Sequence, residues 1–202
     1  LLEDLTFTGT TQTRTISLVG IPNLKRLNVS GNFTSLLGLN VSSVPLLEYL
    51  DCSMSELSYL DVSMLTQLKE LRCSNNRLTV LDLTGLTQLT KLECDGNKIA
   101  ALNLSHNTLL ENVNCSYNLI TNLNLNGLNE LKHLNLNVNK IAGTLDLSPH
   151  QNIEYLYAGE NDITFLNLSG LQNLINASCS NSQLLTNLNL TGCINLMGLG
   201  LT

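Results

Sequence analysis

The sequence is poor in the residues that usually fill a globular core. It has no Trp, and aromatic residues make up only 4% of its 202 positions, although 43% of the residues are hydrophobic. Because large rings are almost missing, a core formed by this chain must be built from stacked Leu, Ile and Val side chains.

Positive charge and long apolar runs are also scarce. The chain has 10 Lys and Arg against 16 Asp and Glu, which gives a formal net charge of -6, and it has no basic cluster. This balance argues against nucleic acid or an anionic membrane surface as a partner. No apolar run approaches the roughly 20 residues of a membrane span, so the sequence predicts no membrane insertion.

Motifs typical of catalytic, phosphate-binding or metal sites are absent as well. The three His residues lie far apart, at His106, His133 and His150. There is no GxSxG, no HExxH and no phosphate-binding glycine loop. The six Cys form no CxxC pair, which gives a zinc site little support. The sequence therefore predicts a chain that is not an enzyme and that holds no metal or cofactor.

An internal repeat covers almost the whole chain. Leu68, Leu89, Leu110 and Leu131 each begin a block of the same pattern, and each lies 21 residues after the one before. Numbered from this first residue, a block has apolar side chains at positions 1, 4, 6, 11, 14, 16 and 19 and Asn at position 9. We expect one domain over residues 1–202 with about nine units, which begin at Leu2, Leu24, Leu47, Leu68, Leu89, Leu110, Leu131, Ile153, Leu174 and Leu196.

The pattern within a unit predicts short strands. Apolar residues alternate at positions 4 and 6 and again at positions 14 and 16, which is the period of a strand. The residues between them are too few for a typical helix. We therefore expect an all-β solenoid with two short parallel strands per coil, tight turns between them, and little or no α-helix.

Five of the six Cys share one position of the repeat. Cys52, Cys73, Cys94, Cys115 and Cys179 all stand at position 6. Since other units have Phe, Val, Leu or Ala there, position 6 is predicted to face the core, where a free Cys acts as a small apolar residue. Cys193 is also expected inside. A disulfide between neighbouring coils is the alternative.

Position 9 predicts a structural column of asparagines. A side-chain amide both donates and accepts hydrogen bonds, so it can satisfy backbone groups that a turn leaves buried. Because coils stack about 4.8 Å apart, we expect a continuous ladder. Its Asn members are Asn32, Asn76, Asn97, Asn118, Asn139 and Asn161.

Position 15 carries Asp or Asn in successive units, which allows two interpretations. Calcium needs six to eight oxygen ligands, yet only Asp61 and Asp82 are neighbouring carboxylates. A hydrogen-bonded surface ladder is therefore the favoured interpretation. The Asn-x-Ser/Thr sequences follow from the repeat and are not taken as glycosylation sites.

The first strand of each unit is predicted to present positions 2, 3, 5, 7 and 8 to solvent. Charges of opposite sign alternate along this face, as at Glu70 beside Lys91, and such pairs stabilise a sheet. One patch departs from this pattern because it gathers aromatic side chains, and exposed Tyr is favoured in binding surfaces. The candidate ligand-binding residues are Tyr117, His133, Tyr155 and Tyr157, with Tyr49 standing apart. Cross-strand packing is the alternative explanation.

The motif LxxLxCxxNxL followed by LxxLDLS resembles bacterial leucine-rich-repeat proteins of the short class, and it is distantly similar to internalin-like surface proteins. The resemblance implies a right-handed superhelix and a non-enzymatic, monomeric module on a secreted or cell-surface protein. Such a module binds a protein, or a glycan, on the face of the LxxLxC strands. The alternatives are a structural spacer without a ligand and an accessory to an enzyme or an effector. Neither end carries an obvious polar cap, so we expect a longer protein.

Overall fold

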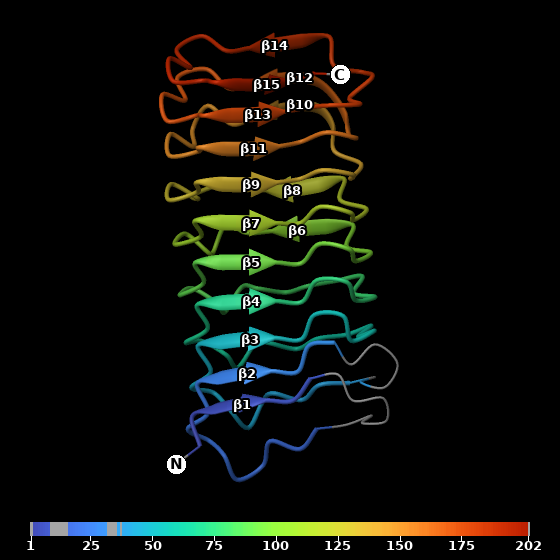
Figure 1. Ribbon diagram of the computed structural model, residues 1–202, viewed down its shortest axis with the longest axis vertical. Coiled ribbons are helices and arrows are strands. Elements are labelled where there is room, and N and C mark those ends of the chain that lie inside the picture. Colours follow the sequence, from blue (N-terminus) through green and yellow to red (C-terminus); the bar gives the residue numbers. More distant parts are fainter. Residues whose placement is uncertain (1, 9–15, 32–35, 37, 202) are drawn as a thin grey trace.

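The computed structural model describes residues 2–8, 16–31, 36 and 38–201. Over these residues the chain winds into a β-solenoid of about nine turns, and no helix is present among them. Successive coils lie one above another along a single axis (Figure 1). The predicted all-β solenoid of parallel strands is confirmed.

One continuous sheet forms the first face of the solenoid. It has ten parallel strands in the order β1-β2-β3-β4-β5-β7-β9-β11-β13-β15, each with three residues. Every strand places its central residue, at position 4, against the same residue of the next coil, as in Leu71 against Leu92. The strands are β1 (Asp4–Thr6), β2 (Arg26–Asn28), β3 (Tyr49–Asp51), β4 (Glu70–Arg72), β5 (Lys91–Glu93), β7 (Asn112–Asn114), β9 (His133–Asn135), β11 (Tyr155–Tyr157), β13 (Asn176–Ser178) and β15 (Gly198–Gly200).

The second face is less continuous than the sequence predicted. It contains a pair, β6 (Ala101–Asn103) with β8 (Asn122–Asn124), and a three-stranded sheet of β10 (Ala142–Asp146), β12 (Asp162–Asn167) and β14 (Asn187–Asn189). In the described part of the earlier coils, a single parallel bridge between Asn40 and Asp61 marks the same path. Within the described residues, the second strand predicted for every coil therefore forms only from Ala101 onward. In the described part of the earlier coils, the chain follows the same path with too few hydrogen bonds between coils to form a strand.

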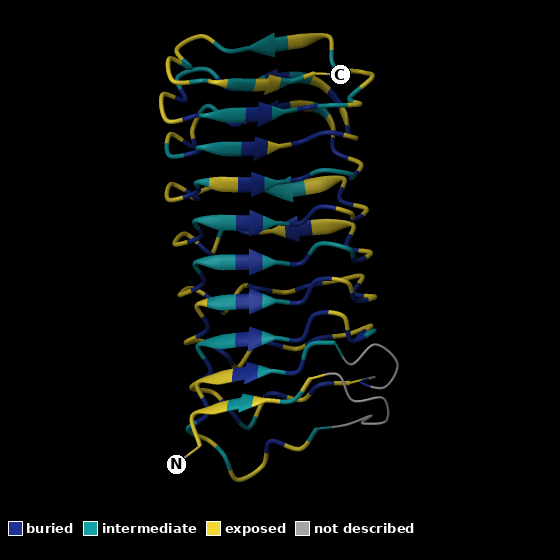
Figure 2. Ribbon diagram, viewed as in Figure 1, coloured by how far each residue is buried: buried dark blue, intermediate teal, exposed yellow. Residues whose placement is uncertain are grey.

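The core between the two faces is aliphatic. The residues at positions 1, 4, 11, 14 and 16 are almost all buried, and Figure 2 shows a buried centre in most strands of the first sheet. The thiols of Cys52, Cys73, Cys94 and Cys115 are fully buried, and all six Cys are free. Burial raises the pKa of Cys115 to about 12. Cys193 is only partly buried, and its thiol donates to the carbonyl of Leu168.

The asparagine ladder is buried, and it connects adjacent coils through the backbone. In Asn118 the side-chain Nδ2 lies 3.0 Å from the carbonyl of Cys94 in the coil before and 3.1 Å from the carbonyl of Cys115 in its own coil. Its Oδ1 accepts from the N–H of Ile99 at 2.9 Å. Four more residues make the same contacts: Asn76, Asn97, Asn139 and Asn161. Asn32, predicted as a member, lies outside the described residues.

The corner after each first strand requires an unusual backbone conformation at position 8. This residue has a φ between 52° and 64° in seven consecutive units, and the seven are Met54, Asn75, Gly96, Tyr117, Val138, Glu160 and Asn181. Non-glycine residues rarely adopt this left-handed conformation, least of all a β-branched residue such as Val138. The position-8 N–H points along the axis and donates to the position-7 carbonyl of the next coil, as from Tyr117 to Asn137.

Position 7 corrects one sequence prediction. It was expected to face solvent, but Ser53, Ser74 and Ser116 are buried there. For Ser53 and Ser116 the cause is a local turn in which the position-5 side chain accepts from the residue two positions later, whereas the hydroxyl of Ser74 donates to Asp95 Oδ1 in the next coil. The Oδ1 of Asn114, for example, accepts from both the N–H and the hydroxyl of Ser116. This contact draws the serine in toward the backbone.

Candidate functional site

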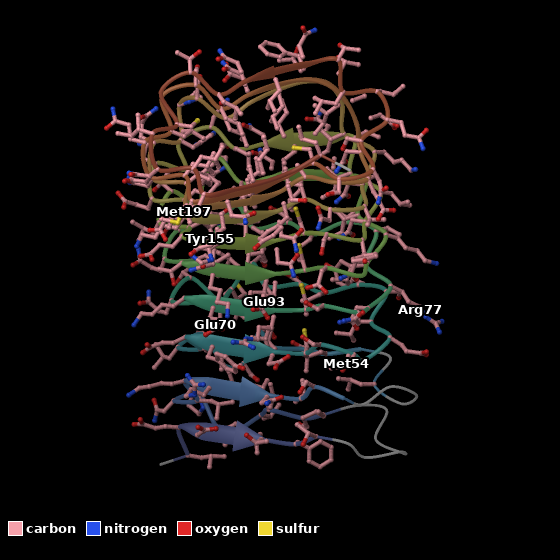
Figure 3. All side chains as sticks on the ribbon, turned by 45° about the horizontal axis from the view of Figure 1, so that its top comes forward. Met54, Glu70, Arg77, Glu93, Tyr155 and Met197 are labelled. Atoms are coloured by element: carbon pink, nitrogen blue, oxygen red, sulfur yellow. The ribbon has the colours of Figure 1, made fainter. Side chains whose placement is uncertain are left out.

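The outer face of the ten-stranded sheet divides into two regions of different chemistry. Strands β2 to β5 carry charged side chains that pair with one another within a strand and across neighbouring coils. Arg72 Nη2 lies 2.7 Å from Glu70 Oε1, and Lys91 Nζ lies 2.9 Å from Glu93 Oε1 and 3.4 Å from Glu70 Oε1. Figure 3 shows Glu70 and Glu93 on this face, away from Arg77 and Met54 at its edge. These charges are already satisfied, so this region offers little to a charged ligand.

Tyr49 belongs to the charged region. The guanidinium of Arg26 lies 4.1 Å above the centre of its ring, and that of Arg72 lies 5.9 Å away. Burial raises the pKa of its hydroxyl, with the nearby Asp51 carboxylate adding to the effect. Because the ring is held between two cations, Tyr49 packs as part of the sheet surface, apart from the other candidate residues.

Strands β7 to β11 are nearly uncharged at positions 3 and 5, and here the surface is hollowed. We call this hollow the sheet depression. Its volume is about 280 Å³, and the short Asn side chains within it lie between longer side chains on both sides. The outward residues that line it come from four neighbouring strands: Lys91, Glu93, Asn112, Asn114, His133, Asn135 and Tyr157.

Aromatic side chains border the sheet depression toward the C-terminal coils. The rings of His133 and Tyr155 are in contact, with centroids 4.8 Å apart and planes tilted by 45°. Tyr157 follows on the same strand as Tyr155 and is 38% exposed. The structure therefore brings His133, Tyr155 and Tyr157 together. Tyr117 lies away from them, at the corner, with 63% of its surface exposed.

Several amides in the sheet depression retain hydrogen-bonding capacity. Asn114 uses its side chain on Asp95 and Ser116. By contrast, within the described part of the chain the side chain of Asn112 makes no hydrogen bond, and Asn135 uses only its Oδ1, as an acceptor from the N–H of Asn137. Sequence reasoning missed these residues. The signal was present, because both coils carry short polar residues at positions where their neighbours carry charged or aromatic ones.

Nothing in the described residues is arranged for metal chemistry. No group of three or more His, Cys, Asp or Glu side chains in this part of the chain is placed to hold an ion. The position-15 carboxylates instead cap local turns: Asp82 accepts from both the N–H and the hydroxyl of Thr84. These hydrogen bonds lower the pKa of Asp82. A membrane-spanning helix is likewise not found in the described ranges.

Comparison with known proteins places the fold. A family model described as Leucine Rich repeats (2 copies) matches residues 66–106. No curated protein matches the chain in sequence. Among solved structures, the functional domain of InlJ from Listeria monocytogenes, described as including a cysteine ladder, is 32% identical, with a TM-score of 0.77 over 96% of this chain and 50% of that chain.

Two further structures support the same assignment. YopM from Yersinia enterocolitica is 25% identical, with a TM-score of 0.75 over 94% of this chain and 40% of that chain. The internalin InlF from Listeria monocytogenes is 21% identical, with a TM-score of 0.70 over 90% of this chain and 62% of that chain. This likeness to InlF concerns the fold alone.

The chain spans about half the length of the InlJ domain that it matches. Leucine-rich-repeat domains are generally non-catalytic and commonly bind proteins. Repeats of about 21 residues, a buried column of Cys and Asn and a helix-free parallel solenoid identify this chain as a leucine-rich-repeat protein that resembles the bacterial internalins.

Proposed function

We propose that this chain is a non-enzymatic interaction module that binds a protein partner on the outer face of the ten-stranded sheet, over the sheet depression. One observation carries the proposal. The charged side chains of the face pair with one another over β2 to β5, and from β7 the face is nearly uncharged at positions 3 and 5, hollow and bordered by His133 and Tyr157. Aromatic side chains beside amides with unused hydrogen-bonding capacity are typical of protein-binding surfaces.

Rigidity supports this function. The aromatic residues stand on strands that are hydrogen-bonded on both sides, so little conformational entropy is lost when a partner orders them. Tyr155 is held further by its contact with His133. The resemblance to the internalin InlJ supports a secreted or cell-surface location for the module.

The ion-paired half of the face supports a structural role for those coils. Salt bridges between exposed groups contribute about 0–1 kcal/mol each, and here they join successive coils, as between Lys69 and Glu48. A spacer without a ligand would need only such contacts along its whole length. The change of surface chemistry at β7 favours binding over a spacer role for the C-terminal half.

The test is selection of a phage library of random peptides on the immobilised domain. Enriched peptides should bind the wild-type domain and lose binding to a variant that combines Tyr155→Ala and Tyr157→Ala. The matched control is Tyr59→Ala, because Tyr59 is 71% exposed and lies on the second side of the solenoid, beside Asn40 and Asp61. Equal binding to the double variant, or no enrichment at all, would refute the proposal. Thermal unfolding of each variant confirms that it is folded.

A further inference from the structure

A second surface lies at the corner that follows the first strands of the later coils. We call it the edge groove. It runs along the solenoid axis between the side chains of positions 8 and 10, and its volume is about 640 Å³, within the range of ligand-binding clefts. The residues that define it are Leu119, Val138, Lys140, Glu160, Asp162 and Leu184.

Apolar side chains are exposed toward both ends of the edge groove. Leu119 is 49% exposed and Leu184 is 52% exposed. Leu184 lies in the ninth coil, where the unit gains one residue, and its neighbour Leu185 packs against the core in its place. The extra residue therefore turns one leucine outward. Exposed apolar residues within a groove mark interaction sites more strongly than residues scattered over a surface.

Unpaired negative charge lies between these leucines. Glu160 and Asp162 form no salt bridge with any other described residue. One cation lines the groove beside them, Lys140 of the preceding coil, and it forms no salt bridge with either carboxylate in the described chain, while residues 141–202 contain no Lys or Arg. Two carboxylates against one ammonium group leave the edge groove net negative. The same corner differs in the third and fourth coils. There Arg77 Nη2 lies 2.7 Å from Glu56 Oε1, so the charges at this corner are paired.

The backbone at the edge groove cannot pair with an added strand. The N–H groups of Val138 and Glu160 already donate to the carbonyls of Gly159 and Ser180 in the next coils. The amides of Asn139 and Asn161 belong to the ladder. An occupant must therefore be recognised through its side chains, and it must lie along the axis rather than beside a strand.

We infer that the edge groove binds an extended segment of a protein partner that carries a basic side chain between two apolar ones. Three steps between coils, from Leu119 to Leu184, span about 14 Å at 4.8 Å per step. An extended chain advances about 3.3 Å per residue, so residues one, three and five of a segment cover the same span on one side. The outer two would meet the leucines, and the central one, midway between the coils of Lys140 and Asp162, would extend a long basic side chain to Glu160 and Asp162. This inference does not depend on the sheet depression.

The experiment uses the peptide acetyl-Leu-Ser-Lys-Ser-Leu-amide as the probe, added to isotope-labelled protein while backbone amide shifts are recorded by NMR. We expect saturable shifts at Leu119, Glu160 and Leu184. Combining Glu160→Gln with Asp162→Asn should weaken binding about fivefold, the effect expected of one or two exposed charge pairs. The control that combines Asp61→Asn and Asp82→Asn removes two carboxylates from the second face and should leave binding unchanged.

Several results would overturn the inference. These are shifts centred outside the edge groove, no shifts at millimolar peptide, or equal binding of acetyl-Leu-Ser-Glu-Ser-Leu-amide. Equal affinity of the wild type and the double carboxylate variant would do the same. Shifts at these amides that depend on protein concentration without peptide would identify a second copy of the chain as the occupant and would also overturn it. Tyr155→Ala combined with Tyr157→Ala should leave peptide binding here intact.

Discussion

The rungs of the asparagine ladder should differ in their contribution to stability, and the end rungs should contribute most. Each inner carbonyl is shared: the Cys94 carbonyl accepts from the amides of both Asn97 and Asn118. The shared arrangement ends at Asn76 and Asn161, because position 9 is Ser55 in the coil before and Ser182 in the coil after. The Cys52 carbonyl accepts only from Asn76 among the described residues.

The magnitudes follow from the groups that each substitution leaves without a partner. Asn118→Ala leaves the N–H of Ile99 unpaired. The Cys94 carbonyl still accepts from the amide of Asn97, and the Cys115 carbonyl still accepts from the amide of Asn139. An unpaired buried donor costs about 1–3 kcal/mol, and each lost hydrogen bond costs about 1 kcal/mol more. We therefore expect a loss of about 3–5 kcal/mol in the free energy of unfolding.

Asn76→Ala should cost about 1–3 kcal/mol more than Asn118→Ala. It leaves the N–H of Leu57 unpaired and also removes the amide partner of the Cys52 carbonyl. Asn161→Ala should behave in the same way, since Asn161 is the one ladder amide that donates to the Ala158 carbonyl in the described chain. Neither residue lies in a terminal coil, so fraying of the ends does not explain such a difference.

The assay is urea unfolding followed by circular dichroism, with the midpoint and the denaturant dependence fitted together. An unchanged denaturant dependence shows that the variants unfold as the wild type does. Asn122→Ala is the control, because Asn122 is exposed on β8 and a surface change of this kind stays within about 0.5 kcal/mol. Equal losses at Asn76 and Asn118, or a larger loss at Asn118, would refute the idea of shared carbonyls.

Three further predictions concern the corner, the turns and the thiols. Val138→Asn should stabilise the protein by about 1 kcal/mol in urea unfolding, because φ is 56° at this residue and Asn tolerates that conformation better than a β-branched residue. Asn75→Val should lower the free energy of unfolding by a similar amount. A less stable Val138→Asn variant or a more stable Asn75→Val variant would contradict the reasoning. Hydrogen bonds lower the pKa of Asp61, Asp82 and Asp146 in the folded state, so the stability they contribute is present above about pH 4, their unfolded pKa, and is lost as pH falls through the folded pKa. Replacing all three by Asn should flatten the acid side of a plot of melting temperature against pH, and an unchanged slope would count against it. Native alkylation at pH 8 followed by mass spectrometry should modify Cys193 first and leave Cys73, Cys94 and Cys115 unmodified until the protein unfolds, because the latter are fully buried; early modification of Cys94 would show that the core opens.

Much of the fold could be predicted from the sequence because the repeat length specifies which side chains touch. With a spacing of 21 residues, Leu71 and Leu92 meet only if coils stack in register. The same argument predicted the buried column that contains Cys94 and the hydrogen-bonded ladder that contains Asn118. The ion-paired face followed from the columns too, since Glu70 and Lys91 occupy the same position in adjacent units.

The candidate site was predicted less completely. His133 and Tyr155 were expected as neighbours and are in contact, but Tyr117 points from the corner instead of the sheet. The direction of a side chain at position 8 depends on its left-handed φ, and the pattern of apolar residues contains no information about that angle. The same limit explains why Ser116, drawn into its turn by Asn114, was expected at the surface.

The sequence by itself determined the solenoid, its register and its ladder, because identical units can bury their apolar residues only by stacking like on like. The tertiary structure alone decided where the second strands pair between coils, and where the surface is hollow. Hollows depend on the relative heights of side chains in neighbouring coils, as at Asn112 beside Tyr157, and on where an extra residue such as Leu184 is turned outward. Those features arise between units and at corners, where a repeat pattern no longer constrains the chain.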